Sequence, residues 1–147
     1  MTNVSIVSGG SGETFKAGPI QIRVLEDGSH TDNRLGAVMI TVPPKVDQIP
    51  PHLHRMHDET FLVISGKLRF GAGNDSYDVA AGEYVIVPIG APHKFTNPFD
   101  EPAVFFNSFT PAYYVDYLRE ISRLETAGQI NKEDILKAMA RYATEPA

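Results

Sequence analysis

The segment PPHLHRMHDETF, residues 50–61, holds three of the five histidines of the chain, and two acidic residues directly follow the third. Imidazoles grouped in this way suit an exposed polar turn, a pH sensor or most of the first coordination shell of a metal ion. His52 and His54 are two positions apart, and a strand directs such residues to the same face. If the residues RMHD form the turn of a hairpin, Glu59 returns alongside both imidazoles.

A fourth donor follows in the segment GEYVIVPIGAPHKFTN, where His93 comes directly after a turn rich in proline and glycine. Three neutral imidazoles and one carboxylate suit a borderline divalent transition metal, so iron, manganese, cobalt, nickel, copper and zinc are all candidates. A metal that prefers six ligands would keep two positions for a chelating substrate, or for a substrate and dioxygen. The alternative, a polar interior without a metal, is disfavoured because burying four unpartnered groups costs several kcal/mol.

The composition limits the other classes of function. With 147 residues, 42% of them hydrophobic, the chain fits a single domain over residues 1–147. It has no cysteine, which excludes disulfides, thiolate catalysis and thiolate metal ligands. The net charge of −5, with no cluster of Lys and Arg, argues against a nucleic-acid partner and favours a small-molecule substrate.

The hydropathy of the chain argues against a membrane partner. No stretch is long and apolar enough to cross a bilayer. The first residues, MTNVSIVSGG, lack the basic start and the continuous apolar core of a secretory signal. We therefore expect a soluble protein located in the cytoplasm.

Short alternating runs separated by turn residues fill about residues 14–110, a pattern typical of an antiparallel sandwich or barrel. In PIQIRVLED, for example, Ile20, Ile22 and Val24 share one face of a strand. Further strands are predicted at LGAVMITVPP, TFLVISGKLRF, SYDVAAGEYVIVP, HKFTN and AVFFNSFT, which are rich in β-branched or aromatic residues. The chain is therefore predicted to be mainly β.

After Pro111 the hydrophobic period changes, and two short packing helices are predicted within about residues 112–143. Apolar residues from Tyr114 onward recur at three- and four-residue steps, as on one side of a helix. Gly128 is placed to end this first helix, and Asn131 to cap the second.

Two segments of the chain carry the motifs of a known family. The first motif, G-x5-H-x-H-x3–4-E-x6-G, is met by His52, His54, Glu59 and Gly66, with Pro or Lys where the leading glycine would fall. The second, G-x5-P-x-G-x2-H-x3-N, is met at every fixed position, by Gly82, Pro88, Gly90, His93 and Asn97. These motifs resemble those of the cupin superfamily. The resemblance implies an antiparallel β-barrel, or jelly roll, in which one divalent transition metal ion is bound by His52, His54, Glu59 and His93.

Within that superfamily, HDETFLVISGKLRF, VPIGAPHKFTN and FNSFTPAYYVDYLREI resemble small single-domain cupins grouped with quercetin 2,3-dioxygenase. This resemblance implies a metal-dependent dioxygenase that acts on a small enol, phenol or flavonol-like substrate, with Glu59 doubling as the catalytic base. One barrel of this kind hosts several functions. Two alternatives therefore stay open: a non-catalytic metal-dependent binder of small molecules, and a non-redox isomerase or decarboxylase.

Four further side chains have roles that the sequence leaves less defined. Phe61 and Phe95 share strand faces with predicted ligands, so they form either an apolar wall of the substrate pocket or part of the core. We expect His57 in an exposed turn rather than as a fifth ligand, and His30 in a surface loop. Because a single barrel exposes sheet edges, we also expect a homodimer, paired through an N-terminal strand or the C-terminal helices.

Overall fold

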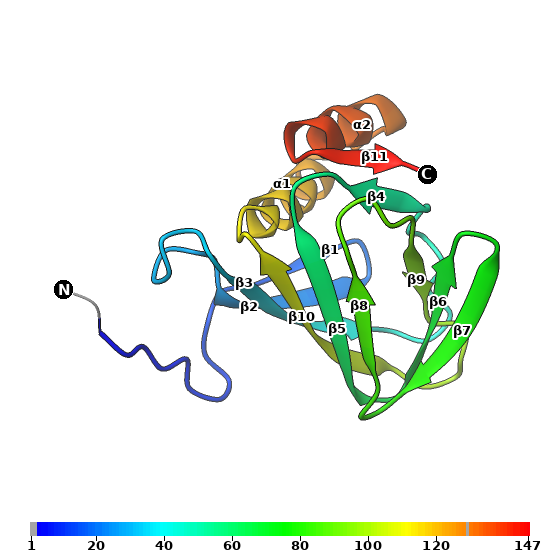
Figure 1. Ribbon diagram of the computed structural model, residues 1–147, viewed down its shortest axis with the longest axis horizontal. Coiled ribbons are helices and arrows are strands. Elements are labelled where there is room, and N and C mark those ends of the chain that lie inside the picture. The colour runs from blue at the N-terminus through cyan, green and yellow to red at the C-terminus, as the bar shows by residue number, and fades with distance from the viewer. Residues whose placement is uncertain (1–2, 129) are drawn as a thin grey trace.

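The structure is a computed structural model that describes residues 3–128 and 130–147. A six-stranded sheet with the order β1-β2-β3-β10-β5-β8 and a three-stranded sheet with the order β7-β6-β9 form the barrel (Figure 1). The strands of the barrel are β1 (Thr14–Ala17), β2 (Ile20–Glu26), β3 (Gly36–Val42), β5 (Asp58–Ser65), β6 (Lys67–Ala72), β7 (Asp75–Ala80), β8 (Tyr84–Val87), β9 (Lys94–Thr96) and β10 (Ala103–Thr110). Two helices and the pair formed by β4 (His52–His54) and β11 (Thr144–Pro146) lie together at one end of the barrel (Figure 1).

Alternating side chains build the interior of this barrel, as the sequence predicts. In β2, Ile20 and Ile22 are buried while Gln21 between them is exposed. In β10, every second side chain from Ala103 to Phe109 is buried. The mainly β fold with antiparallel sheets is confirmed. The single domain over residues 1–147 stays a prediction.

The connection between β4 and β5 differs from the predicted hairpin. β4 pairs with β11, whereas β5 pairs with β10 on one side and β8 on the other. The residues RMHD therefore lead the chain from the barrel end into the six-stranded sheet, and they do not join two paired strands. The physical reason is that the backbone groups of β4 are already engaged, by β11 and by a bridge between His52 and His93.

Two helices follow the last long strand, which confirms this part of the prediction. They are α1 (Tyr114–Thr126) and α2 (Lys132–Arg141). The side chain of Asn131 caps α2, because its oxygen accepts a hydrogen bond of 2.9 Å from the backbone N–H of Asp134. Neither described helix has the length and apolar character needed to cross a bilayer. No sequence pattern predicts β11, which follows α2 and returns the chain to β4.

The turn between β5 and β6 depends on a glycine. Gly66 has a φ of 73°, in the left-handed region that side chains with a Cβ rarely adopt. A Cβ at this position would lie 2.3 Å from the carbonyl oxygen of Pro102 and 2.9 Å from the Cα of Ala103. The glycine of the first motif therefore serves the backbone, since only glycine fits between these two segments.

We predict that Gly66→Ala lowers the free energy of unfolding by about 3 kcal/mol, the combined cost of the left-handed backbone and the steric overlap. Urea unfolding measures this loss. Gly73→Ala is the matched control, because Gly73 has a φ of 63° and a Cβ there would meet no atom within 4 Å, so only the backbone cost of about 1 kcal/mol is expected. Equal losses in the two variants would contradict the steric account.

Candidate metal centre

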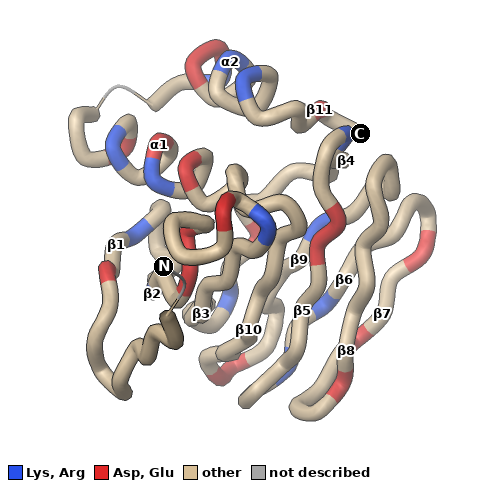
Figure 2. Tube along the Cα trace, turned by 60° about the vertical axis from the view of Figure 1, so that its left-hand side comes forward, with Lys and Arg blue, Asp and Glu red and all other residues tan. Residues whose placement is uncertain are grey.

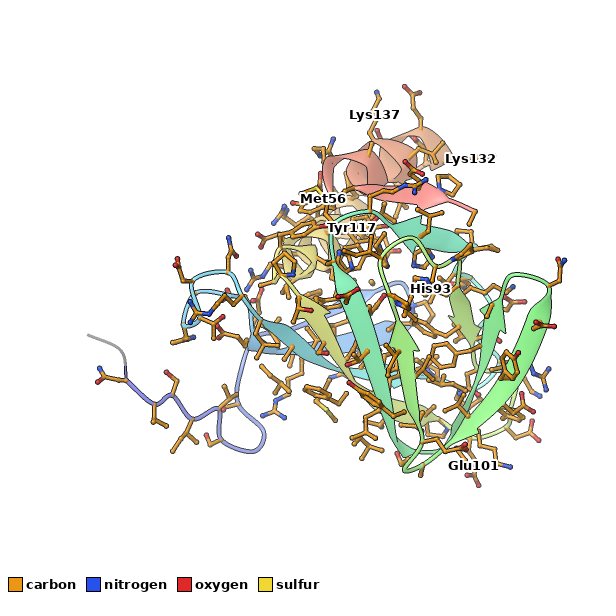
Figure 3. All side chains as sticks on the ribbon, in the orientation of Figure 1. Met56, His93, Glu101, Tyr117, Lys132 and Lys137 are labelled. Atoms are coloured by element: carbon orange, nitrogen blue, oxygen red, sulfur yellow. The ribbon has the colours of Figure 1, made fainter. Side chains whose placement is uncertain are left out.

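The structure brings the four predicted ligands together inside the barrel. One ring nitrogen from each of His52, His54 and His93 lies within 4.8 Å of the other two. Oε2 of Glu59 lies 3.0 Å from Nε2 of His54 and 3.2 Å from Nε2 of His93. Three of these side chains are almost completely buried, and His52 is half-buried. In Figure 3, His93 lies inside the upper part of the barrel, on the side of the helices.

Backbone hydrogen bonds fix the distance between the two segments that carry the histidines. The N–H of His52 donates to the carbonyl oxygen of His93 at 3.0 Å, and the N–H of His93 donates back to His52 at 2.9 Å. The N–H of Gly90 donates to the carbonyl oxygen of His54 at 2.7 Å. Gly90 has a φ of 83°, so the glycine of the PIGAP turn allows the backbone to reach β4 and aims His93 at the cluster.

The Nδ1 atoms of two histidines are committed to backbone carbonyls. Nδ1 of His52 lies 2.9 Å from the carbonyl oxygen of Pro50, and Nδ1 of His93 lies 3.0 Å from that of Ala91. Because a carbonyl oxygen only accepts hydrogen bonds, both Nδ1 atoms must carry the proton. In the neutral ring the Nε2 atom is then bare, and its lone pair is available to a cation.

Thr144 of β11 fixes the third histidine in the same way. Its hydroxyl Oγ1 donates to the carbonyl oxygen of Tyr142 at 3.1 Å, so it can only accept from Nδ1 of His54, which lies 2.9 Å away. His54 therefore also presents a bare Nε2 when neutral. Thr144 is 3% exposed and lies ninety positions from His54 in the chain, so sequence spacing gives no sign of this contact.

This donor set fits a divalent cation. Bare Nε2 atoms of His54 and His93 face an oxygen of Glu59, and such electron-rich atoms repel one another unless a proton or a metal ion lies among them. Burial lowers the pKa of His52 to about 4, with His93 acting in the same direction, so His52 is neutral near pH 7. Burial also lowers the pKa of His93, but contact with Glu59 outweighs it and raises that pKa overall. Nitrogen and carboxylate donors of this kind suit the first-row transition metals.

Glu59 is an ionised carboxylate in the interior. Burial raises its pKa, but the neighbouring rings of His54 and His93, which can donate to it from Nε2 only when they are protonated, outweigh burial and hold the pKa below its usual range. Nδ2 of Asn107 donates to Oε1 of Glu59 at 3.1 Å and to the carbonyl oxygen of Thr60 at 2.8 Å, which orients the carboxylate. The sequence pattern does indicate Asn107, because this residue is the one polar side chain among the alternating buried positions of β10.

The prediction that His57 lies in an exposed turn is wrong. Its side chain is completely buried, with ring centroids of His54 and Tyr114 at 4.1 and 4.7 Å. The burial arises because the start of α1 packs over the connection between β4 and β5. Burial lowers the pKa of His57 to about 3, which keeps the ring neutral. Nδ1 lies 3.1 Å from the hydroxyl of Tyr113, and Nε2 has no hydrogen-bond partner in the described part of the chain. His30, by contrast, is exposed as predicted.

His57 also belongs to a second set of donors. One nitrogen of His57, one nitrogen of His54 and one oxygen of Glu59 lie within 4.8 Å of one another. The two sets share His54, so the cluster extends beyond the four residues that the motifs indicate. The two-residue alternation expected of a strand over residues 52–59 does not predict that His57 joins the cluster, because the chain leaves β4 and turns before it enters β5.

A cavity of about 210 Å³ adjoins the cluster. Phe61 and Phe95 both line this cavity, and their ring centroids are 6.0 Å apart. Each side chain is therefore part of the cavity wall and also packs in the core. Tyr114 and Tyr117 of α1 line its opposite side, and Figure 3 shows Tyr117 above the barrel, toward the helices. The remaining lining is formed by Ala17, Ile20, Ile22, Ile40, Gln48, Ile49, Pro50, His52, Glu59, His93, Asn107, Leu118, Ile121, Glu125, Ile130, Ile135, Met139 and Thr144.

Comparison with known proteins agrees with this geometry. The family described as Cupin domain matches residues 38–109, which include all four clustered side chains. The chain belongs to the cupin superfamily. This cupin is 29% identical over 90 residues to quercetin 2,3-dioxygenase of Bacillus subtilis. That match covers 61% of this chain and only 26% of the relative.

Solved structures show the same fold at low sequence identity. KdgF from Halomonas sp. superposes with a TM-score of 0.65 and 16% identity, over 74% of this cupin and 94% of that chain. A predicted oxalate decarboxylase from Thermotoga maritima superposes with a TM-score of 0.58 and 16% identity, over 63% of this cupin and 80% of that chain. Such identities establish a shared barrel and leave the reaction undefined.

We predict that Thr144→Val weakens the binding of Zn²⁺ to this cupin by about 10- to 100-fold, because valine keeps the shape of threonine but removes the acceptor that fixes His54. Thr144→Ser is the matched control, since it retains the hydroxyl and should bind Zn²⁺ almost as tightly as the wild type. Competition with a chromophoric chelator measures both affinities. A Thr144→Val variant with unchanged affinity would show that the hydroxyl does not support the centre.

Proposed function

We propose that this cupin is a metal-dependent dioxygenase that acts on a small enol or phenol. The observation that carries the proposal is the position of the histidine and carboxylate cluster against an apolar cavity. His52, His54, Glu59 and His93 would hold one divalent transition metal ion. When bound, such a metal supplies Lewis acidity toward a substrate oxygen and redox chemistry toward dioxygen.

The residues of the chain have separate roles in this proposal. Glu59, ionised and oriented by Asn107, accepts the proton that the substrate hydroxyl loses when it becomes an enolate or phenolate. Phe61 and Phe95 provide an apolar wall against which an unsaturated substrate packs. The helices over the cavity keep bulk water away from the reacting atoms.

The cavity volume favours a small substrate. Ligand cavities of drug-sized molecules measure about 300–1,000 Å³. The cavity beside the cluster is smaller, at about 210 Å³. A substrate with one or two rings fits this space better than a complete flavonol, so the proposal narrows to simple phenols, catechols and enols.

The non-redox alternative has less support, because an isomerase or decarboxylase needs a further acid or base beside the substrate. Burial raises the pKa of Tyr117 to about 12 and that of Tyr114 well above its ordinary value, so neither serves as a base near pH 7. A non-catalytic binder, in contrast, would use the same cluster and the same cavity. Turnover therefore separates the two functions that the site supports.

Metal content tests the ligand assignment. Protein purified without added metal should carry about one transition-metal ion per chain by elemental analysis, and His54→Ala should lose most of it, because one of four donors is removed. His30→Ala is the matched control, since His30 is exposed and bonds to Glu26 outside the barrel. Full occupancy in His54→Ala would contradict the assignment.

Oxygen uptake tests the reaction. Metal-replete protein should consume dioxygen with at least one member of a panel of catechols and enols, and mass spectrometry should show oxygen incorporated into the product. Glu59→Gln should lower the turnover number by about 100-fold or more, because the amide cannot accept the proton. If calorimetry shows saturable binding while the ligand stays unchanged and no oxygen is consumed, the protein is a non-catalytic binder and the dioxygenase proposal is wrong.

The predicted homodimer remains a proposal, and an apolar row on the six-stranded sheet supports pairing through that sheet in place of the N-terminal strand or the C-terminal helices. The register places Phe106 opposite Met39 and Leu62, and Leu62 opposite Tyr84. An apolar row therefore spans β3, β10, β5 and β8 on the outer face of the six-stranded sheet, and it ends at Arg23 of β2. The helices lie at the end of the barrel and do not cover this face (Figure 1). Strand spacing and rise give the face an area of about 600 Å², close to the roughly 800 Å² per partner of a standard interface.

We predict that the protein scatters light as a particle of about twice the 16.1 kDa chain mass. Tyr84→Glu should convert it to the monomer, because the new charge would be buried without a partner. Tyr77→Glu is the matched control: Tyr77 lies on β7, outside the row, and is 56% exposed against 55% for Tyr84. A wild-type monomer, or dimers of Tyr84→Glu, would exclude this interface.

A further inference from the structure

We propose that α1 and α2 act as a roof that restricts the cavity to neutral, apolar ligand bodies and rejects ligands that carry a second anionic group beside the metal-binding one. The inference deepens the proposed function and rests on its placement of the substrate in this cavity. Residues of both helices lie outside the segment 38–109 that matches the family. Ligand selection would therefore depend on the helices that follow the matched barrel segment.

One face of α1 forms the long side of the cavity. Its lining residues Tyr114, Tyr117, Leu118, Ile121 and Glu125 recur at steps of one, three and four positions, which places them on one side of the helix. From Tyr114 to Glu125 the helix rises about 16 Å. The lining face of α1 therefore presents an almost continuous aliphatic and aromatic surface from Tyr114 to Ile121, with Glu125 at its far end.

The second helix extends this apolar surface. Ile135 and Met139, four positions apart, line the cavity from α2, and Met139 is buried. Opposite the roof, the barrel contributes Ile20, Ile22 and Ile40. Apolar side chains therefore enclose the ligand body from both sides.

The positive charges of the roof point away from the cavity. None of the lining residues that the structure describes is Lys or Arg. Arg119 of α1 pairs instead with Glu13, Asp27 and Asp116 at 2.7–2.9 Å on another face of the helix. Figure 2 shows basic and acidic residues distributed along both helices. The roof thus has a charged outer side and an uncharged inner side over most of its length.

The charges that do line the cavity are negative. Glu59 lies in the cluster, and Glu125 lines the cavity near the other end of α1. A carboxylate or phosphate on the ligand body would lose part of its hydration and would meet no cationic side chain among the described lining residues. A phenol or enol oxygen at the cluster escapes this cost because a bound divalent metal compensates its charge.

Calorimetry with a matched pair of ligands tests the inference. The probes are 4-methylcatechol, which is neutral outside its chelating oxygens, and 3,4-dihydroxybenzoate, which carries a carboxylate at the corresponding position. Zn²⁺-loaded protein under nitrogen is used, so that no oxidation interferes. We expect 4-methylcatechol to bind at least about 100-fold more tightly, because the buried carboxylate would have no counter-charge. Equal binding, tighter binding of the benzoate, or binding of neither ligand would overturn the inference.

A charge placed in the roof should reverse the selection. Ile121→Lys, on the inner face of α1, is expected to improve benzoate binding at least tenfold and to weaken binding of 4-methylcatechol. Leu136→Lys is the control, because Leu136 lies on α2, is 39% exposed and does not line the cavity. Unchanged selectivity in a folded Ile121→Lys protein would count against the roof. If Ile121→Lys fails to fold, the wild-type affinity ratio still decides the question.

The outcomes separate this inference from the proposed reaction. Selective binding of the neutral ligand without oxygen uptake would support ligand selection by the roof and would identify the protein as a non-catalytic binder. Oxygen uptake with both catechols, bound at similar affinity, would support the dioxygenase proposal and contradict ligand selection by the roof.

Discussion

The buried carboxylate of Glu59 is the constraint on which the rest of the site depends. An anion removed from water must be compensated nearby, or it becomes protonated or destabilises the fold. The amide of Asn107 donates one hydrogen bond to this carboxylate, and its other close neighbours are Nε2 of His54 and Nε2 of His93. Yet both imidazoles have their Nδ1 protons committed elsewhere, so in the neutral state they turn bare nitrogens toward the carboxylate. A cation among these atoms removes the conflict, which is why the geometry favours a metal.

The C-terminal third of the chain completes this arrangement in two ways. β11 pairs with β4, the three-residue strand that carries His52 and His54, and Thr144 of β11 fixes the ring of His54. The preceding helices close the cavity over the same cluster. The segment from α1 to β11 therefore both supports the metal-binding side chains and shapes the cavity beside them.

Much of the barrel follows from local pattern. The alternation of Ile20, Ile22 and Val24 predicts a half-buried strand, and the paired motifs place His52, His54, Glu59 and His93 at one end of a barrel. These features depend on short-range periodicity and on fixed spacing, which a single sequence displays. Gly66, in contrast, lies inside the predicted strand TFLVISGKLRF, which the structure divides into β5 and β6 at a turn that needs the left-handed backbone of this glycine.

The features that escaped prediction depend on distant contacts. β11 has three residues and no alternation, and it forms only because β4 offers it a free edge. Burial of His57 depends on the packing of α1, which starts more than fifty residues later, and the sequence around His57 is as polar as an exposed turn. Thr144 has no motif at all. In each case the deciding partner lies far along the chain, where local patterns carry no information about it.

X-ray absorption spectroscopy of the Zn²⁺-loaded protein tests whether the histidine cluster binds the metal ion. We expect the multiple scattering of imidazole rings, with nitrogen and oxygen neighbours at roughly 2.0–2.2 Å from the zinc, and a reduced imidazole contribution in His93→Ala. A zinc ion surrounded only by water and carboxylate oxygens, with no imidazole scattering, would contradict it.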